Sequence, residues 1–270
     1  RKATRVARAT ATENSVEVVA REWFQRMSPG WVDKHRIKII QRLERDVFPW
    51  LGNRPVAELT APEVLAVLRR IEERGANETA RRALGDLSAI CRYAVVTGRA
   101  LSDPCRDLRG ALTPKVVRHF AAVTDPKAMP DLLRAINGYQ GGLVVRSALR
   151  LAPLLFVRPG ELRSARWADI DLEAGEWRFT ASKTGQPHIV PLARQAVAIL
   201  RELHPLTGRR DLVFPGARSP SRPMSENTVN VALRSLCIER ETTSGHGFRA
   251  MARTVLEEHL RFPAHLIEAQ

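Results

Sequence analysis

Residues 156–162 have the sequence Phe-Val-Arg-Pro-Gly-Glu-Leu. Arg158 follows an apolar run of helical character, and Pro159 and Gly160 restrict the chain directly after it. Glu161 lies three residues further on, where a helical turn brings its carboxylate near the Arg158 guanidinium. An arginine held in one pose suits contact with an anion. Other contacts to that anion are expected from three later residues: Lys183, His246 and Arg249.

The overall charge indicates a polyanionic partner. The 270 residues carry a formal net charge of +14, and the pI is near 10.9. Residues 1–110 hold 21 Lys and Arg against 14 Asp and Glu, and residues 111–270 hold 22 against 15. Arginine outnumbers lysine 37 to 6, which a GC-rich coding sequence would also produce, but that bias does not explain the positive excess. Both halves are therefore expected to contact a polyanion such as nucleic acid.

Several other classes of protein are disfavoured. The sequence has no apolar run long enough to cross a bilayer and does not begin with a secretory signal, so we expect a cytoplasmic protein. Cys91, Cys105 and Cys237 are far apart and lack metal spacing, so we expect small buried hydrophobic residues. HExxH, CxxC, GxGxxG, P-loop and GxSxG motifs are absent, and the late histidines are not spaced as ligands. No metal and no cofactor are expected.

Residues 15–110 are expected to form a bundle of four helices. Amphipathic patterns place these helices at about residues 15–27, 33–49, 60–75 and 77–97. Each pattern begins at a residue that favours an N-cap: Ser15, Asp33, Thr60 and Asn77. Glu63 completes a capping box with Thr60. Pro49 is expected to end the second helix.

Basic side chains recur on the polar sides of these helices: Lys34, Arg36, Lys38, Arg42, Arg81, Arg82 and Arg92. Any single one is expected to be a solvated surface charge, whereas the set could follow a DNA backbone. Residues 1–14 are basic, rich in Ala and Thr, and lack a core pattern. We expect them to be a linker or the tail of a missing domain, because the chain also starts without a methionine.

Residues 111–124 show little periodicity and are expected to link two domains. Residues 125–270 are expected to form a mixed α+β domain. Patterns predict helices at about residues 126–136, 142–156, 193–203, 225–237 and 246–259, with Pro153 kinking or shortening the second and Ser225 capping the fourth. The alternation of Trp177 and Phe179 with polar residues predicts a strand, and residues 188–192 predict its return. The fold class is therefore mainly α with a small β-hairpin or sheet.

The predicted hairpin and the last long helix carry the candidate chemistry. Lys183 would lie at the tip of the hairpin, and His246 and Arg249 lie three residues apart at a helix start, which favours anions. With Arg158, these residues could surround one phosphate and stabilise a phosphoryl transition state. Lysine, unlike arginine, can lose its proton beside other cations, so Lys183 suits a general acid. Taken alone, His246 would be a capping or core histidine and Lys183 an ordinary turn residue.

Motifs in a fixed order support this interpretation. They are Arg-Pro-Gly-Glu-Leu at 158–162, Trp-Ala-Asp-Ile-Asp at 167–171, Lys183 ahead of Pro-His-Ile-Val-Pro-Leu at 187–192, His-Gly-Phe-Arg at 246–249 and Ile-Glu-Ala-Gln at 267–270. In order and spacing the sequence resembles the tyrosine recombinases, and among them the bacteriophage and genomic-island (prophage) integrases. The resemblance covers about residues 15–270.

The resemblance implies a site-specific DNA recombinase that cuts and rejoins DNA through a 3′-phosphotyrosine, for integration or excision of a mobile element. It implies that Arg158 and Arg249 bind the scissile phosphate, that Lys183 is the general acid, that His246 lies between them and that Glu161 supports Arg158. The helical bundle resembles a core-binding domain, which would close with the catalytic domain around double-stranded DNA at att-type core sites. A tetramer, a DNA-bending host factor, an excisionase and a bacterial nucleoid location are also implied.

The sequence departs from the family pattern in one respect. The nucleophilic tyrosine of the family follows the His-Gly-Phe-Arg helix, whereas Tyr93 and Tyr139 precede it and are expected to be structural. The nucleophile is expected beyond Gln270, and the chain as given is expected to be inactive. Integrases of this kind often carry an N-terminal arm-binding domain as well; residues 1–14 resemble the tail of such a domain, which the sequence itself does not show. Two alternatives stay open: an inactive DNA-binding regulator on the same scaffold, and a type IB topoisomerase.

Overall fold

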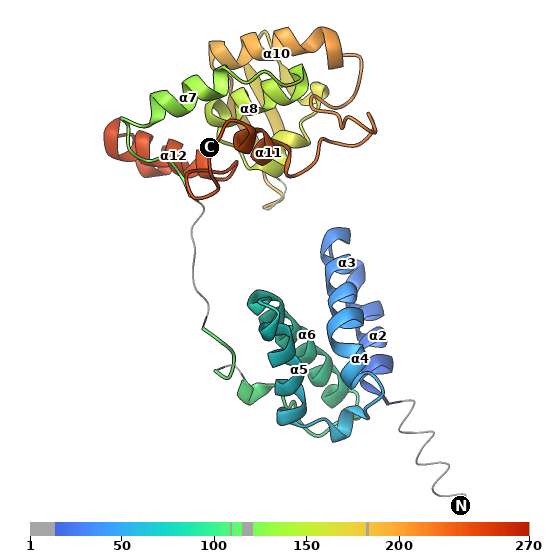
Figure 1. The fold of residues 1–270 in the computed structure, drawn as a ribbon. Helices are drawn as coiled ribbons and strands as arrows, with labels where there is room; N and C mark the ends of the chain where they lie inside the picture. The colour runs from blue at the N-terminus through green and yellow to red at the C-terminus, as the bar shows by residue number, and fades with distance from the viewer. Residues whose placement is uncertain (1–13, 109, 115–120, 182–183, 270) are drawn as a thin grey trace, which may run out of the picture. The chain divides into compact units, whose positions relative to one another are not determined.

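The computed structural model describes residues 14–108, 110–114, 121–181 and 184–269. The chain divides into two compact units, Arg1–Val117 and Arg118–Gln270 (Figure 1). Helices dominate the described part of each unit, and the second unit also holds a small antiparallel sheet. The predicted fold class, mainly α with a small β element, is confirmed. No helix in the described ranges is both long and apolar enough to cross a membrane.

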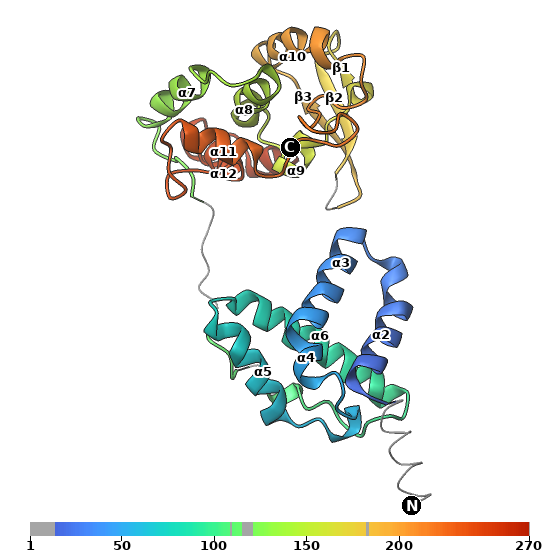
Figure 2. The ribbon, with the colours of Figure 1, turned by 45° about the vertical axis from the view of Figure 1, so that its right-hand side comes forward.

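The described part of the first unit is built from helices, which Figure 2 shows in a view turned by 45° from that of Figure 1. They are α2 (Val16–Met27), η1 (Ser28–Gly30), α3 (Asp33–Arg42), η2 (Leu43–Val47), α4 (Phe48–Leu51), η3 (Val56–Glu58), α5 (Ala61–Glu73), α6 (Asn77–Val96) and η4 (Arg106–Leu108). Two predicted caps are present. The Ser15 hydroxyl accepts the Val18 N–H at 3.4 Å, and a Glu63 carboxylate oxygen accepts the Thr60 N–H at 3.0 Å. These bonds satisfy N–H groups that a helix start would otherwise leave without a partner.

Pro49 does not end the second helix, so this prediction is wrong. The helix passes from α3 into the π turn η2, in which the Phe48 N–H donates to the Leu43 carbonyl. Pro49 then lies in the first turn of α4, where a missing N–H removes no bond of that helix. The wider turn changes the hydrogen-bond pattern just before the proline, and the helix therefore continues to Leu51.

Three predicted N-caps are also wrong: Asp33, Asn77 and Ser225. The residues at the N-cap positions are Val32, Ala76 and Asn227, and none of them makes a side-chain capping bond. Asp33 and Asn77 are instead the first helical residues, where a carboxylate such as that of Asp33 is favoured by the helix dipole. The Ser225 hydroxyl accepts the Asn227 N–H at 3.3 Å, and it therefore stabilises the turn that precedes α11.

One apolar core holds the first unit together. Its largest fully buried side chains are those of Leu43 in η2, Leu68 in α5, and Leu87 and Ile90 in α6. The same core extends to Cys105, Leu108 and Leu112 beyond α6. The chain therefore packs on this unit into the range 111–124, for which a linker was expected, and the exact domain boundaries stay a prediction.

The second unit combines helices with a three-stranded sheet. Its elements are α7 (Met129–Asn137), α8 (Leu143–Leu155), α9 (Pro159–Arg163), η5 (Trp167–Asp169), β1 (Ile170–Asp171), β2 (Glu176–Thr180), β3 (Pro187–Pro191), α10 (Arg194–Thr207), α11 (Thr228–Ser235), α12 (Gly247–Thr254), η6 (Val255–His259) and α13 (Ala264–Ala269). The strands pair antiparallel in the order β1-β2-β3, with Trp177 opposite Val190. The two predicted strands are confirmed, and β1 adds a short third one.

Helix α8 lies at the centre of the second core. Leu149 and Leu151 are fully buried, and they share this core with Trp177 of the sheet and Phe248 of α12. Pro153 lies in the last turn of α8, which ends at Leu155. Phe156 follows with φ 37°, a left-handed conformation that is unusual for a residue other than glycine. This turn directs the chain toward Arg158.

Candidate active site

Arg158 is held by Glu161, as the sequence predicted. It is the N-cap of α9, with Pro159 as the first helical residue. The Arg158 guanidinium donates to one Glu161 carboxylate oxygen at 2.8 Å, and the Arg158 backbone N–H donates to the other at 3.0 Å. The Glu161 side chain is 4% exposed, whereas that of Arg158 is 35% exposed. A buried carboxylate thus fixes an arginine that still reaches solvent.

Arg249 comes to the same place from α12. Its guanidinium donates to the Phe156 carbonyl at 2.9 Å, across 93 residues of sequence. Burial and the nearby charge of Arg158 lower the pKa of Arg249, and Glu161 partly opposes this effect. Arginine nevertheless stays protonated near neutral pH. Two guanidinium groups therefore lie close enough to repel each other, and a bound anion would relieve that repulsion.

The start of α12 is fixed by the absence of a side chain at Gly247. A Cβ atom there would lie 2.3 Å from the Ala121 carbonyl oxygen, so only glycine fits. The loop before the helix is held as well, because the Asn230 side-chain oxygen accepts the Gly245 N–H at 2.9 Å. These contacts position His246 at the N-cap of α12, one turn before Arg249.

His246 is exposed and lies beside Arg249. Partial loss of water and the positive charge of Arg249 lower the pKa of His246 below its ordinary value. The imidazole is therefore neutral at pH 7 until an anion binds next to it. The structure brings together three of the four residues predicted to surround the phosphate, Arg158, His246 and Arg249. Lys183 lies outside the described residues.

The sequence did not reveal a small cavity beside Arg249. This cavity of about 180 Å³ is lined by Phe156, Arg249, Ala250, Arg253 and Ile267. The spacing of Arg249 and Arg253 by four residues on one helix could have indicated that both border one site. The structural role of the Phe156 carbonyl could not have been found in this way, because no local pattern connects it with Arg249.

The two tyrosines make structural contacts. The Tyr93 hydroxyl donates to a Glu22 carboxylate oxygen at 2.6 Å in the first unit, and this bond raises the pKa of Tyr93. Tyr139 packs against the apolar core of the second unit.

Cys91 and Cys105 are buried, as predicted, whereas Cys237 is exposed, so the prediction is wrong for Cys237. One group of side chains could hold a metal, although its two cysteines lack metal spacing in the sequence. Cys91, Asp103 and Cys105 offer ligand atoms that lie within 4.8 Å of one another. Asp103 accepts the Ser88 hydroxyl at 2.5 Å and the Cys105 N–H at 2.9 Å. Within the described ranges no further His, Cys, Asp or Glu joins this group, and a tetrahedral zinc site needs another ligand. The contact with Cys91, together with burial, raises the pKa of the Cys105 thiol.

Comparison with known proteins identifies the family. Residues 16–111 match the family described as "Phage integrase central domain", and residues 122–268 match the one described as "Phage integrase family". The chain belongs to the phage integrase family. It is 35% identical to the integrase of Enterobacteria phage P4 over 284 residues, which cover 98% of the chain and 64% of that protein. It is 36% identical to the putative protein IntB of Escherichia coli K12, over 93% of the chain and 67% of that protein.

Solved structures of the family share the fold. A lambda integrase tetramer bound to a Holliday junction superposes with a TM-score of 0.73 at 18% identity, over 94% of this chain and 76% of that one. A lambda integrase dimer (residues 75–356) bound to a COC′ core site superposes with a TM-score of 0.71 at 21% identity, over 92% of each chain. The present chain spans about two thirds of the length of its phage P4 and IntB relatives.

Proposed function

We propose that the protein is a tyrosine-type site-specific DNA recombinase, which cuts and rejoins DNA to integrate or excise a mobile element. The family match supports the class of reaction. The observation that carries the proposal is the convergence of Arg158, His246 and Arg249, with Arg158 held by the buried Glu161. Three groups that favour one anion, gathered from two distant segments, suit a DNA phosphodiester.

In the proposed reaction, Arg158 and Arg249 bind the non-bridging oxygens of the scissile phosphate. A tyrosine oxygen attacks phosphorus and forms the 3′-phosphotyrosine bond, while the bond to the 5′ oxygen breaks. The leaving oxygen takes a proton from Lys183, which is proposed as the general acid. His246 lies beside Arg249 and gains a proton as the phosphate binds. Tyr93 and Tyr139 have no catalytic role in this scheme, and the attacking tyrosine is proposed to lie outside residues 1–270.

The proposed partner is double-stranded DNA with att-type core sites. The described part of the first unit would act as the core-binding domain and that of the second as the catalytic domain. Assembly into a tetramer, and action with a DNA-bending host factor and an excisionase in the bacterial nucleoid, belong to the same proposal. The neighbouring lambda integrase structures, one a tetramer on a Holliday junction and one a dimer on a core site, support the DNA partner and the assembly into oligomers.

The direct test is covalent trapping. The full-length protein would be incubated with a nicked suicide duplex that carries the core site, and protein–DNA complexes would be counted after denaturation. Arg158→Ala and Arg249→Ala should each abolish the covalent complex and leave much of the DNA affinity. The control is Arg134→Ala, which removes an exposed arginine that pairs with Asp131 on α7.

Unchanged trapping in the Arg158 and Arg249 variants would refute their proposed roles. A full-length protein that binds the duplex but forms no covalent complex would instead be a DNA-binding regulator. Covalent trapping together with relaxation of supercoiled DNA, but without strand exchange, would indicate a type IB topoisomerase.

A further inference from the structure

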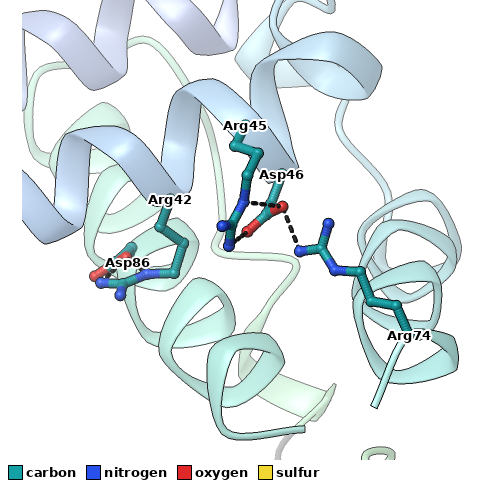
Figure 3. A network of polar contacts seen from close by, with 5 residues as sticks. All are labelled: Arg42, Arg45, Asp46, Arg74 and Asp86. Atoms are coloured by element: carbon teal, nitrogen blue, oxygen red, sulfur yellow. Dashed lines mark hydrogen bonds and ion pairs between the residues drawn. The ribbon is translucent and has the colours of Figure 1, made fainter. Parts of the chain in front are cut away.

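Figure 3 shows two carboxylates of the first unit, Asp86 and Asp46, that pair with arginines. The two sites differ in how far the arginines are exposed to solvent. Asp86 pairs with Arg42 at 2.7 Å, and both side chains are largely buried, at 14% and 10% exposed. Burial raises the pKa of Asp86 in spite of the hydrogen bond from Arg42. Both partners are thus enclosed, and Arg42 has a structural role. Arg42 is therefore no longer a candidate for contact with a DNA backbone.

Asp46 holds its arginines differently. Its carboxylate accepts Arg45 Nε at 3.0 Å and another Arg45 nitrogen at 2.9 Å, and it also accepts Arg74 (Figure 3). The Asp46 side chain is 0% exposed, whereas those of Arg45 and Arg74 are 65% and 46% exposed. A guanidinium carries more N–H donors than these bonds use, so both arginines keep donors for another acceptor.

The charge state of Asp46 supports this arrangement. Burial alone would raise the pKa of Asp46, but the hydrogen bonds from Arg45 and Arg74 outweigh burial and lower it. One buried negative charge therefore lies beneath two exposed positive charges. The π turn η2 carries both Arg45 and Asp46, and Arg74 follows the last residue of α5, so the three groups are fixed by two elements.

These arginines border an open groove with a volume of about 730 Å³. Its charged and aromatic lining consists of Arg45, Asp46, Trp50, Arg69, Arg70, Glu73 and Arg74. Trp50 is an exposed aromatic residue, and the Arg70 guanidinium lies over its ring, 3.7 Å from the ring centroid. Arg70 is therefore positioned as well. Four arginines face two carboxylates, and positive charge dominates the groove.

Arg45 also lines a second groove, with a volume of about 420 Å³. Lys38 and Arg82 line it too, together with Glu78, which pairs with Arg82 at 3.1 Å, so basic side chains still outnumber the one carboxylate in its lining. The two grooves therefore adjoin at Arg45. A single small anion would need only one such place. Two adjoining basic grooves suit a chain of phosphates better, because successive phosphates can each contact a cation.

The arrangement at Asp46 matches that of the candidate active site. In both places a buried carboxylate fixes a partly exposed arginine: Glu161 holds Arg158, and Asp46 holds Arg45 and Arg74. We propose that the groove bordered by Arg45, Trp50, Arg69, Arg70 and Arg74 binds the phosphodiester backbone of DNA, with Arg45 and Arg74 as a paired phosphate clamp. The inference rests on the proposed function for its choice of DNA, and it assigns a contact surface that the catalytic residues do not supply.

The test is the salt dependence of DNA binding by the full-length protein. Each phosphate contact contributes about 0.9 to the slope of log Kd against log salt. The double variant Arg45→Ala/Arg74→Ala should lower that slope by about 2 and weaken binding equally for core-site and unrelated duplexes. Arg21→Ala is the matched control, because Arg21 is an exposed arginine of the same unit, paired with Glu17 and Glu44 outside the groove.

The double variant leaves Asp46 buried without a partner, so it could unfold the first unit. Arg70→Ala provides a second variant, because Arg70 contacts exposed Trp50 and no buried carboxylate is involved. It should lower the slope by about 1 with an unchanged unfolding temperature. Slopes equal to that of Arg21→Ala in both variants would overturn the proposal. Unchanged DNA binding with weakened self-association in sedimentation would also overturn it, and would indicate an acidic protein surface as the occupant.

Failure of this inference differs from failure of the proposed function. The salt slope is measured on binding alone, and covalent trapping is measured on cleavage. If the groove variants lower the salt slope but the full-length protein forms no covalent complex, the groove is a DNA contact and the recombinase proposal is rejected. If the full-length protein forms the covalent complex but the groove variants leave the salt slope unchanged, the recombinase proposal stands and the groove proposal is rejected.

Discussion

Substitution of Glu161 by glutamine tests whether the pose of Arg158 matters for cleavage. Glu161 accepts two hydrogen bonds from Arg158, one from the guanidinium at 2.8 Å and one from the backbone N–H at 3.0 Å. Glutamine offers one acceptor oxygen, so one of these donors would face an NH₂ group instead. A hydrogen bond to a charged group contributes about 1.5–3 kcal/mol. The same change removes the negative charge of Glu161, which partly offsets the repulsion between Arg158 and Arg249.

We therefore expect Glu161→Gln to slow single-turnover cleavage of a suicide duplex by about 100-fold, which corresponds to about 2.7 kcal/mol. DNA affinity should change less than tenfold, because Arg158 stays charged and partly exposed. Glu202→Gln is the control, since Glu202 is an exposed glutamate of the same unit that pairs with Arg146 and Arg150. Cleavage by Glu161→Gln at the rate of this control would refute the argument that the buried carboxylate positions Arg158.

Two further changes test how α12 presents its residues. Gly247→Ala places a Cβ atom 2.3 Å from the Ala121 carbonyl, so it should destabilise the second unit by about 1–3 kcal/mol in thermal unfolding. Gly160→Ala, whose Cβ lies inside α9 and meets nothing within 4 Å, should not destabilise this unit, and equal stability of the two variants would contradict the packing argument. Burial and the charge of Arg249 lower the pKa of His246 in the protein alone, and a bound phosphate should raise that pKa. DNA affinity should therefore increase as the pH falls from the raised pKa of the bound state to the lowered pKa of the free protein, and His246→Gln should remove that increase; an equal increase in the variant would exclude His246 as the group that titrates.

Local sequence signals predicted the local features of this chain. Thr60 and Glu63 predicted a helix start, and the spacing of Arg158 and Glu161 predicted their ion pair, because both pairs interact within one helical turn. Pro49 misled for a physical reason: a proline is also accommodated in the first turn of a helix, and Pro49 lies in the first turn of α4, directly after the π turn η2.

Contacts between distant segments could not be predicted from one sequence. The bond from Arg249 to the Phe156 carbonyl depends on how α12 packs against α8. The approach of Cys91 to Cys105, and the enclosure of Asp46 by Arg74, likewise depend on tertiary packing rather than on spacing. The sequence therefore indicated which residues have suitable chemistry, and the fold decided which of them meet.

The central claim is that Arg158 and Arg249 bind one DNA phosphate, and a double-mutant cycle tests it most directly. The cleavage position would first be mapped by covalent trapping. The Kd of the full-length protein would then be measured for a duplex with the normal phosphate and for one with a neutral methylphosphonate at that position. The methylphosphonate should weaken binding of the wild-type protein by about tenfold, or about 1.4 kcal/mol. It should leave the affinity of Arg158→Ala/Arg249→Ala unchanged, because the partners of that phosphate are already absent. An equal loss of affinity in both proteins would contradict the claim.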